Sequence, residues 1–178
     1  LLIFMLEIER TYLVKKLPAD LGSFEKNEIK QGWFSELPSP LRIRQTDLPE
    51  QAGARFELTK KLVKNPGDFS AYEETNLPIK AEEFERLWSH VVRSLVKTRY
   101  LVPLEAGLRS ELDVFHGKLE GLAFVEVEFE SREQMTAFQA PSWFGADVTV
   151  EEFSANWFLA NSSYEEIRDL ISAKGITH

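Results

Sequence analysis

Five short segments of this chain carry two like-charged side chains two residues apart, with one uncharged residue between them. The acidic pairs are Glu7 and Glu9, Glu111 and Asp113, and Glu126 and Glu128, and the basic pairs are Arg42 and Arg44, and Lys97 and Arg99. Side chains two apart on a β-strand lie on the same face, about 7 Å from each other. If these segments are strands, each one presents two charges of a single sign on one face.

Pairs of carboxylates and pairs of bases favour different partners. Carboxylate oxygens bind hard divalent cations, whereas Arg and Lys side chains bind phosphate groups. Any single pair is more typical of the solvated face of an ordinary antiparallel sheet. For the set of five, the uniform sign within each pair favours an enclosed interior, because a solvated face would mix signs to avoid repulsion. Such an interior must be wet and must hold its charges against each other or against a ligand, and a metal-bound polyphosphate would satisfy both signs.

The elements that must position these side chains have the pattern of short strands. Turn residues gather at 17–23, 37–40, 48–53, 65–70 and 103–107 and divide the chain. The strand candidates between them are Leu6–Val14, Glu28–Phe34, Leu41–Gln45, Arg55–Leu62, Ser70–Leu77, Lys97–Val102, Leu108–His116 and Leu122–Glu130. Strands joined mostly by short loops predict an antiparallel sheet that closes on itself.

Three further segments have helical periodicity, namely Lys80–Val96, Ser131–Ala140 and Ser163–Lys174. Ser131 and Ser163 are each followed three residues later by Gln or Glu, which is the spacing of a capping box. The apolar stripes of helices need an apolar partner surface, and the outer face of a closed barrel supplies one while the charged faces turn inward. We therefore predict a mainly β protein of the α+β class, an eight-stranded antiparallel closed barrel decorated by helices.

The length predicts one domain. We expect this domain to cover residues 5–178, with the barrel over about 6–160 and a C-terminal helix over about 163–175. Residues 1–4 are expected to be an extension before a natural start at Met5.

The composition excludes several classes of function. The 178 residues have a net charge of −8, no cysteine and three histidines. Disulfide scaffolds, thiolate nucleophiles and Cys-ligated zinc are therefore excluded, and no P-loop, Rossmann or nucleophile-elbow motif occurs. The acidic balance argues against nucleic acid and anionic membranes as partners, and no apolar run is long enough to cross a bilayer. We expect a cytoplasmic protein.

The charged pairs also resemble, in their order, the motifs of a known family. The segment Glu7–Arg10 resembles the start of the ExExK motif of the CYTH superfamily, the triphosphate tunnel metalloenzymes. The other matching segments follow in family order: Leu41–Gln45, Lys60, Lys97–Tyr100, Glu111–Phe115, Val125–Phe129, Pro141–Thr149 and Asn156–Ala160. The resemblance spans roughly 6–160 and is greatest to the bacterial inorganic-triphosphatase branch, rather than to the class IV adenylate cyclases or the mammalian thiamine triphosphatases.

The resemblance implies an eight-stranded tunnel that binds Mg²⁺ or Mn²⁺ through acidic residues and a triphosphate through basic ones. The implied metal ligands are Glu7, Glu9, Glu126, Glu128 and Asp113. The implied substrate-binding residues are Arg42, Arg44, Lys60, Lys97, Arg99, Glu74, Glu111, Asp113, Thr11 and Trp33. Asn76 stands where the family has a second carboxylate after Glu74. The four glutamates and Lys60 form the expected catalytic set. Lys61, next to Lys60, is expected to face solvent.

Two positions depart from the family pattern. Thr11 stands at the fifth position of ExExK, where the family has Lys, and Trp33 stands where the triphosphatase branch usually has Tyr. That Lys and Tyr act as a pair on the substrate in the resembled enzymes, so the two changes together put the rate and the preferred substrate in question. Trp33 could stack on an organic group of a substrate, or it could simply pack at the tunnel mouth.

Three functions remain open from the sequence. The first is metal-dependent hydrolysis of inorganic triphosphate or of an organic triphosphate. The second is a tunnel that binds polyphosphate or nucleotide with slow or no turnover, which the Thr11 and Trp33 changes favour. The third is a class IV adenylate cyclase-like reaction. The expected partner is a triphosphate-containing small molecule, and a homodimer is an open possibility.

Overall fold

A computed structural model of the chain describes residues 4–35, 41–49, 53–63 and 70–176. Residues 1–3 of the expected extension, and most of the turns expected at 37–40, 48–53 and 65–70, lie outside these ranges. The strands are β1 (Phe4–Val14), β2 (Lys26–Trp33), β3 (Leu41–Leu48), β4 (Gly53–Val63), β5 (Ala71–Pro78), β6 (Arg93–Pro103), β7 (Arg109–Phe115), β8 (Ala123–Phe129) and β9 (Phe144–Asp147).

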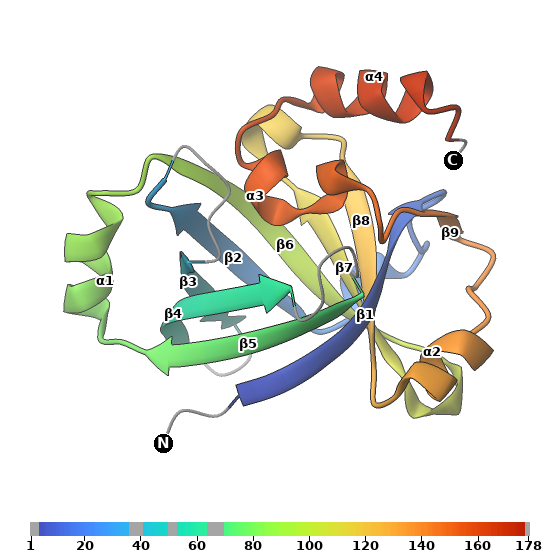
Figure 1. The fold of residues 1–178 in the computed structure, drawn as a ribbon, viewed down its shortest axis with the longest axis horizontal. Coiled ribbons are helices and arrows are strands. Elements are labelled where there is room, and N and C mark those ends of the chain that lie inside the picture. The colour runs from blue at the N-terminus through green and yellow to red at the C-terminus, as the bar shows by residue number, and fades with distance from the viewer. Residues whose placement is uncertain (1–3, 36–40, 50–52, 64–69, 177–178) are drawn as a thin grey trace.

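The strands form one antiparallel sheet in the order β5-β4-β3-β2-β6-β7-β8-β1-β9, and β5 also pairs with β1. This second pairing closes β1–β8 into a barrel, which is seen partly end-on in Figure 1. The predicted eight-stranded closed barrel is confirmed. β9 is an extra strand that was not predicted, and it pairs with the second half of β1.

The helices are α1 (Ala81–Trp88), α2 (Arg132–Ala137), α3 (Asn156–Leu159) and α4 (Tyr164–Ala173), with short 3-10 turns η1 (Leu21–Ser23), η3 (Glu105–Gly107), η4 (Gly117–Leu119) and η5 (Glu152–Ser154). The Ser163 hydroxyl accepts from the Glu166 amide and the Glu166 carboxylate accepts from the Ser163 amide, so α4 begins with the predicted capping box. Figure 1 places α3 and α4 on the side of the barrel away from the N-terminus. None of the helices in the described ranges is long and apolar enough to cross a membrane.

Over β1, β7 and β8 the outer face of the barrel is apolar, as predicted. Alternate residues of β1, β7 and β8, including Ile8, Leu112 and Val127, form a buried cluster on this face that is covered by β9 and α2. α1 packs against β3 and β4 elsewhere on the barrel. On β2, Gly32 allows the segment after α1 to come close, because a Cβ at this position would lie 2.5 Å from the Val91 side chain. The outer apolar face leaves the opposite face of each strand to line the interior.

One end of the barrel interior is filled by apolar side chains. Leu13, Trp33, Leu95, Phe115 and Phe124 lie on the inward faces of their strands, and each is at most 4% exposed. They pack with a second set of buried residues from the C-terminal region, namely Val148, Phe153, Leu159, Ala160, Ile167 and Ile171. The charged part of the interior therefore begins beyond an apolar end that α3, η5 and α4 close.

The helix predicted over Lys80–Val96 is too long. α1 ends at Trp88, and the chain turns and enters β6 at Arg93. The Val92 amide donates to the Trp33 carbonyl at 2.9 Å, which begins the pairing of β6 with β2. Val91, Val92 and Val96 are β-branched and fit a strand at least as well as a helix, so the apolar spacing alone did not locate the boundary.

A charged tunnel as the candidate functional site

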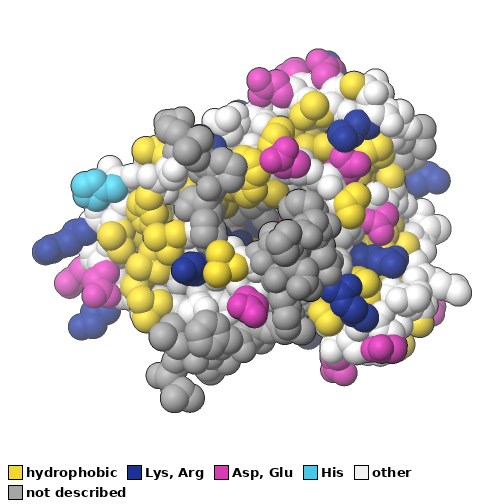
Figure 2. Space-filling model, in the orientation of Figure 1, with side chains coloured by type: hydrophobic (Ala, Val, Ile, Leu, Met, Phe, Trp, Pro, Cys, Tyr) yellow, Lys and Arg dark blue, Asp and Glu magenta, His cyan; other side chains and the backbone are white. Residues whose placement is uncertain are grey.

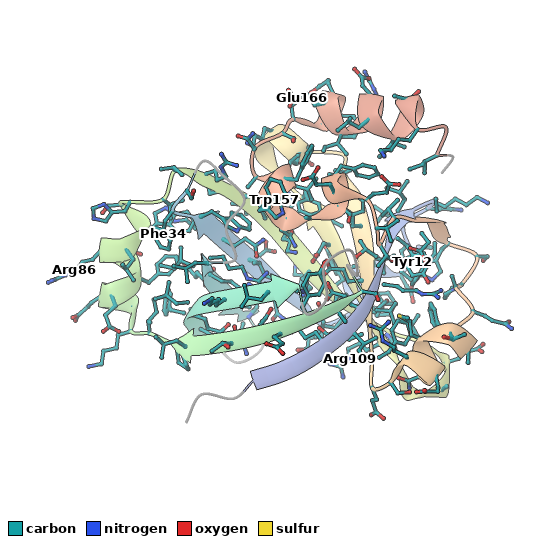
Figure 3. The ribbon with its side chains drawn as sticks, viewed as in Figure 1. Tyr12, Phe34, Arg86, Arg109, Trp157 and Glu166 are labelled. Atoms are coloured by element: carbon teal, nitrogen blue, oxygen red, sulfur yellow. The ribbon has the colours of Figure 1, made fainter. Side chains whose placement is uncertain are left out.

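The side chains of the five like-charged pairs face one shared interior. Ion pairs and electrostatic interactions link these side chains across strands that are not all adjacent. The linked residues are Glu7, Glu9, Arg42, Arg44, Lys97, Arg99, Glu126 and Glu128. The interior includes a cavity of about 600 Å³ that reaches from Glu9, Arg42 and Glu126 to Trp157 of α3. Figure 2 shows this face of the molecule hollowed near its centre, and Figure 3 shows Trp157 beside the opening while Arg86 of α1 points away from it.

Arg99 and Lys97 are held by a single carboxylate at the centre of this tunnel. Arg99 donates from Nε and Nη2 to the two oxygens of Asp113, and Lys97 Nζ lies 2.5 Å from Asp113 Oδ2. Burial would raise the pKa of Asp113, but the Arg99 and Lys97 charges outweigh it and hold this pKa at about 2. Burial, followed by the Arg99 charge, lowers the pKa of Lys97 to about 8. Asp113 therefore positions the two bases.

Two more acidic residues extend this network. Arg99 donates from Nη2 to Glu126 at 2.8 Å and from Nη1 to Glu111. Burial would raise the pKa of Glu126, but the Arg99 and Lys97 charges lower it below its usual value. Asn156 of α3 accepts from Lys97 at 3.2 Å, so the helix beside the cavity is tied to the network. Sequence reasoning did not select Asn156 individually.

A second cluster lies on β3 and β5. Arg42 forms an ion pair with Glu74 at 3.1 Å, and Asn76 donates to the other oxygen of Glu74 at 2.9 Å. Asn76, which stands where the family has a carboxylate, thus binds the neighbouring carboxylate. Burial, followed by the Arg42 and Arg99 charges, lowers the pKa of Arg44 to about 10. Arg42 and Arg44 are thus close enough to repel each other, and an anion between them would relieve this repulsion.

The acidic half of the tunnel comes from β1 and β8. These strands pair with Glu9 opposite Glu128 and Thr11 opposite Glu126. Burial, followed by the charges of Glu111, Glu7 and Glu9, raises the pKa of Glu128 to about 7. Among the described residues no three carboxylates or histidines converge as a ready-made metal cage. This donor set still fits Mg²⁺ or Mn²⁺ chemically, because Mg²⁺ is usually held by one or two carboxylates together with substrate phosphates and waters.

The structure corrects the two adjacent lysines of β4. Lys60 is exposed and faces outward, whereas Lys61 faces the tunnel and lines the cavity. Lys61 Nζ lies 3.1 Å from Glu7 Oε2 and 3.0 Å from Glu9 Oε1. The strand alternates with Glu57, Thr59 and Lys61 inward, and the outward Phe56 packs against α1. The polar residues at 57, 59 and 61 were the signal that could have fixed this orientation.

The two departures from the family pattern both line the cavity. Thr11 is 7% exposed and its amide donates to the Thr149 hydroxyl at 3.0 Å. Trp33 is 4% exposed and packs in the apolar end of the barrel. A ring with so little free surface is a poor stacking platform, so its position favours the packing interpretation over the stacking one.

Sequence reasoning missed a group of uncharged polar residues in the interior. Within the described ranges, the buried polar atoms without a hydrogen-bond partner are both amide atoms of Gln31, Nε of Arg42 and of Arg44, and Oγ1 of Thr46. Gln31 lies directly opposite Arg44 in the β2–β3 register. An unmet buried polar group costs about 1–3 kcal/mol, so this cluster is suited to an additional polar ligand. Its signal in the sequence was Gln31 itself, a polar residue at an inward position of β2.

Comparison with known proteins gives relatives over nearly the whole chain. No protein-family model matches. The inorganic triphosphatase of Nitrosomonas europaea is 36% identical over 159 residues, which are 89% of this chain and 99% of that protein. A crystal structure of an inorganic triphosphatase superposes with a TM-score of 0.63 at 34% identity, covering 88% of this chain and 95% of that chain.

A more distant structure shares the fold alone. A protein from Pyrococcus horikoshii OT3 has a TM-score of 0.51 at 18% identity, covering 96% of this chain and 91% of that chain. The identity to the Nitrosomonas protein, together with the closed barrel and its charged interior, settles the family. The chain belongs to the CYTH superfamily of triphosphate tunnel proteins, in the branch of the inorganic triphosphatases.

Proposed function

We propose that this protein is a triphosphatase that hydrolyses a triphosphate inside the tunnel, with Mg²⁺ or Mn²⁺ as cofactor and inorganic triphosphate as the first candidate substrate. The observation that carries this proposal is the arrangement of bases and carboxylates around one interior. The name of the Nitrosomonas relative supports the choice of substrate.

The basic side chains would bind the phosphate oxygens. Arg42 and Arg44 each have an Nε with no partner among the described residues, and Arg44 lies opposite Gln31 in the β2–β3 register. Lys97, Arg99 and Lys61 supply further positive charge. Guanidinium groups suit this task because their fixed donors match phosphate oxygens in pairs. Phosphoryl transfer depends mostly on such positioning and charge neutralisation, and it needs no protein nucleophile.

The carboxylates Glu7, Glu9, Glu126 and Glu128 would hold the metal, directly or through water. A bound divalent ion offsets charge on the phosphoryl oxygens and lowers the pKa of water. Asp113, in contrast, is occupied with Lys97 and Arg99 and is proposed to position these bases. Lys61 replaces Lys60 in the proposed substrate-binding set, because Lys60 faces outward.

A slow binding tunnel is the second candidate. Thr11 provides no ammonium group, and Trp33 provides no phenol and is mostly buried. If these positions matter for rate as they do in the resembled enzymes, the protein would bind triphosphate tightly and turn it over slowly.

One experiment separates these candidates. Phosphate release is measured from inorganic triphosphate, ATP and thiamine triphosphate, each with Mg²⁺, with Mn²⁺ and with EDTA, and cyclic AMP is measured in the ATP samples. We expect metal-dependent phosphate release, greatest from inorganic triphosphate. The matched variants are Arg44→Met, which should lose activity, and Lys60→Met, which should retain it because Lys60 lies outside the tunnel. Full activity in EDTA, or in Arg44→Met, would contradict the proposal, and tight binding without release would favour the slow tunnel.

A further inference from the structure

Lys61 occupies the carboxylates that we assign to the metal. Its ammonium nitrogen lies 3.1 Å from Glu7 and 3.0 and 3.1 Å from the two oxygens of Glu9. The side chain starts on β4 and reaches β1 across β5, passing over the ring of Tyr72 at 4.2 Å from the ring centre. An ammonium group in this position uses the same oxygen lone pairs that a divalent cation requires.

Three of the other four lumen bases are paired with other carboxylates. Arg42 is paired with Glu74, while Lys97 and Arg99 are fixed by Asp113, and Arg99 also reaches Glu111 and Glu126. The fourth, Arg44, is influenced by the carboxylates of Glu74 and Glu111, and it forms no ion pair with Glu7 or Glu9 among the described contacts. Thr11, one inward position beyond Glu9 on β1, carries no charge. Lys61 is therefore the base that competes with a metal for Glu7 and Glu9.

Lys61 is also able to leave these carboxylates. A lysine carries a point charge on four flexible methylene groups, without the planar geometry that ties Arg99 to Asp113. Its side chain is 22% exposed and borders the cavity together with Arg42. A phosphate placed beside Arg42 would thus present oxygens to the same ammonium group.

We propose that Lys61 couples metal binding to triphosphate binding by holding Glu7 and Glu9 in the empty tunnel and releasing them when its ammonium group moves to a phosphate oxygen. This inference rests on the proposed function, because it needs the metal at Glu7 and Glu9. The metal alone must displace Lys61, and the anion alone must separate it from two carboxylates. When both ligands bind, each ion pair that breaks is replaced by a new one. Coupling of this kind is reciprocal, so each ligand strengthens the other by the same factor.

The test measures binding of each ligand without the other, so it does not depend on turnover. Calorimetry or Mn²⁺ electron paramagnetic resonance gives the affinity for Mn²⁺ alone, and calorimetry in EDTA gives the affinity for inorganic triphosphate alone. Lys61→Met should bind Mn²⁺ about tenfold more tightly than wild type and triphosphate about tenfold more weakly, within the usual range of coupling between sites. Lys60→Met, the adjacent outward lysine, should change neither affinity. A base that only binds phosphate would weaken triphosphate binding and leave Mn²⁺ binding unchanged.

Two further variants separate the possible failures. Arg42→Met removes a lumen charge that is paired with Glu74, so it measures the general effect of charge on Mn²⁺ affinity. A gain in Arg42→Met as large as that in Lys61→Met would overturn the specific role of Lys61. Glu9→Gln should lose Mn²⁺ binding. If it does not, the proposed metal site itself is wrong. If it does, while Lys61→Met binds Mn²⁺ no more tightly than wild type, the metal site stands and the coupling fails.

A measurement on the unmodified enzyme covers the case in which Lys61→Met does not fold. Lysine ammonium signals are recorded by proton–nitrogen NMR, with the Lys61 signal assigned by its absence in Lys61→Arg. Inorganic triphosphate together with Mg²⁺ should shift this signal, and Mg²⁺ alone at the same concentration should leave it in place. A Lys61 signal that does not respond to the two ligands together would overturn the proposal.

Discussion

Arg99 donates two hydrogen bonds to Asp113, from Nε and from Nη2, and each nitrogen lies 2.7 Å from a carboxylate oxygen. The pair lies at the centre of the barrel, where Asp113 is 1% exposed and also receives Lys97. This arrangement fixes the guanidinium plane before any ligand arrives, so no rotamer entropy has to be lost when phosphate binds. Asp113 thus orients the guanidinium group of Arg99 and does not merely cancel its charge.

Replacing Arg99 with Lys should weaken binding of inorganic triphosphate by about 1.5–3 kcal/mol, the size of a hydrogen bond to a charged group. A lysine cannot reproduce the two-point contact with Asp113 and still direct a further donor into the tunnel. Calorimetry in EDTA measures the loss, and Arg86→Lys, an exposed position of α1 that points away from the barrel, serves as the control. Unchanged affinity in Arg99→Lys would place this side chain outside the binding set.

Asp113 should make the fold sensitive to acid. Its pKa in the folded protein is about 2, below the usual 3.8 of an aspartate, so its ionised form stabilises the native state. This stabilisation is complete above about pH 4 and is lost as the pH falls toward 2, with a total of about 2 kcal/mol. Asp113→Asn should lack this part of the decline in the free energy of unfolding between pH 4 and pH 2. Urea unfolding at several pH values measures it, and parallel curves for wild type and variant would contradict the assignment.

Glu128 should have the opposite effect on stability. Burial and the surrounding carboxylates raise its pKa to about 7 from the usual 4.5 of a glutamate. Its protonated form is therefore favoured in the folded state, and stability declines as the pH rises from about 4.5 to about 7. Glu128→Gln should remove this decline and be more stable than wild type at pH 8, while Glu105→Gln, outside this group of carboxylates, should not. Thermal unfolding at pH 5 and pH 8 tests this, and equal differences at the two values would count against it.

Removing Glu126 should abolish metal-dependent turnover. Removing one of several clustered carboxylates relieves repulsion, but Glu126 also forms an ion pair with Arg99 at 2.8 Å. Glu126→Ala should therefore lower the melting temperature slightly as well as the rate. Phosphate release at saturating Mg²⁺ measures the rate, and circular dichroism confirms folding. A folded variant that keeps the wild-type rate would remove Glu126 from the metal site.

The variants Thr11→Lys and Trp33→Tyr restore the Lys and Tyr that the resembled enzymes have at these positions. Made singly and together, they test whether the two positions cooperate. If the two positions cooperate, the double variant should gain more inorganic-triphosphate turnover than the single variants combined, because groups that act as a unit are non-additive. The burial of Trp33 adds an expected loss of stability, since a smaller ring leaves space in the apolar end of the barrel. Fast turnover in wild type with no gain in the double variant would show that this tunnel works without the pair.

The charge pattern was sufficient to predict the barrel and most of its interior. Alternation fixes which face a residue takes once the strand is in register, so Glu7, Arg42 and Glu126 were assigned correctly to one interior. It fails where two candidates are adjacent, as for Lys60 and Lys61, because a shift of one residue turns every side chain to the other face. The resemblance favoured Lys60, whereas the inward Glu57 and Thr59 determine that Lys61 enters the tunnel.

Other parts of the site had only a weak signal in the sequence. Gln31 and Thr46 are uncharged and buried. They stand out only in the structure, where their side-chain polar atoms have no hydrogen-bond partner among the described residues. Asn156 contacts Lys97 through a short helix that has no amphipathic repeat long enough to recognise. The length of α1 was misjudged because Val91 and Val92 satisfy both the helical and the strand pattern.

β1, the first strand of the chain, pairs with strands that come much later in the sequence. β1 pairs with β5 through its first half, with β8 through its middle and with β9 near its end. During synthesis β1 emerges before any of them, and β8 and β9 emerge only when most of the chain has been made. Pairings between such distant segments form slowly, because the entropy cost of closing a long loop comes before any stabilising contact forms. The carboxylates of β1 and β8 therefore come together late in folding. In a nascent or truncated chain without β8, Glu7 and Glu9 would lack Glu126 and Glu128 as neighbours.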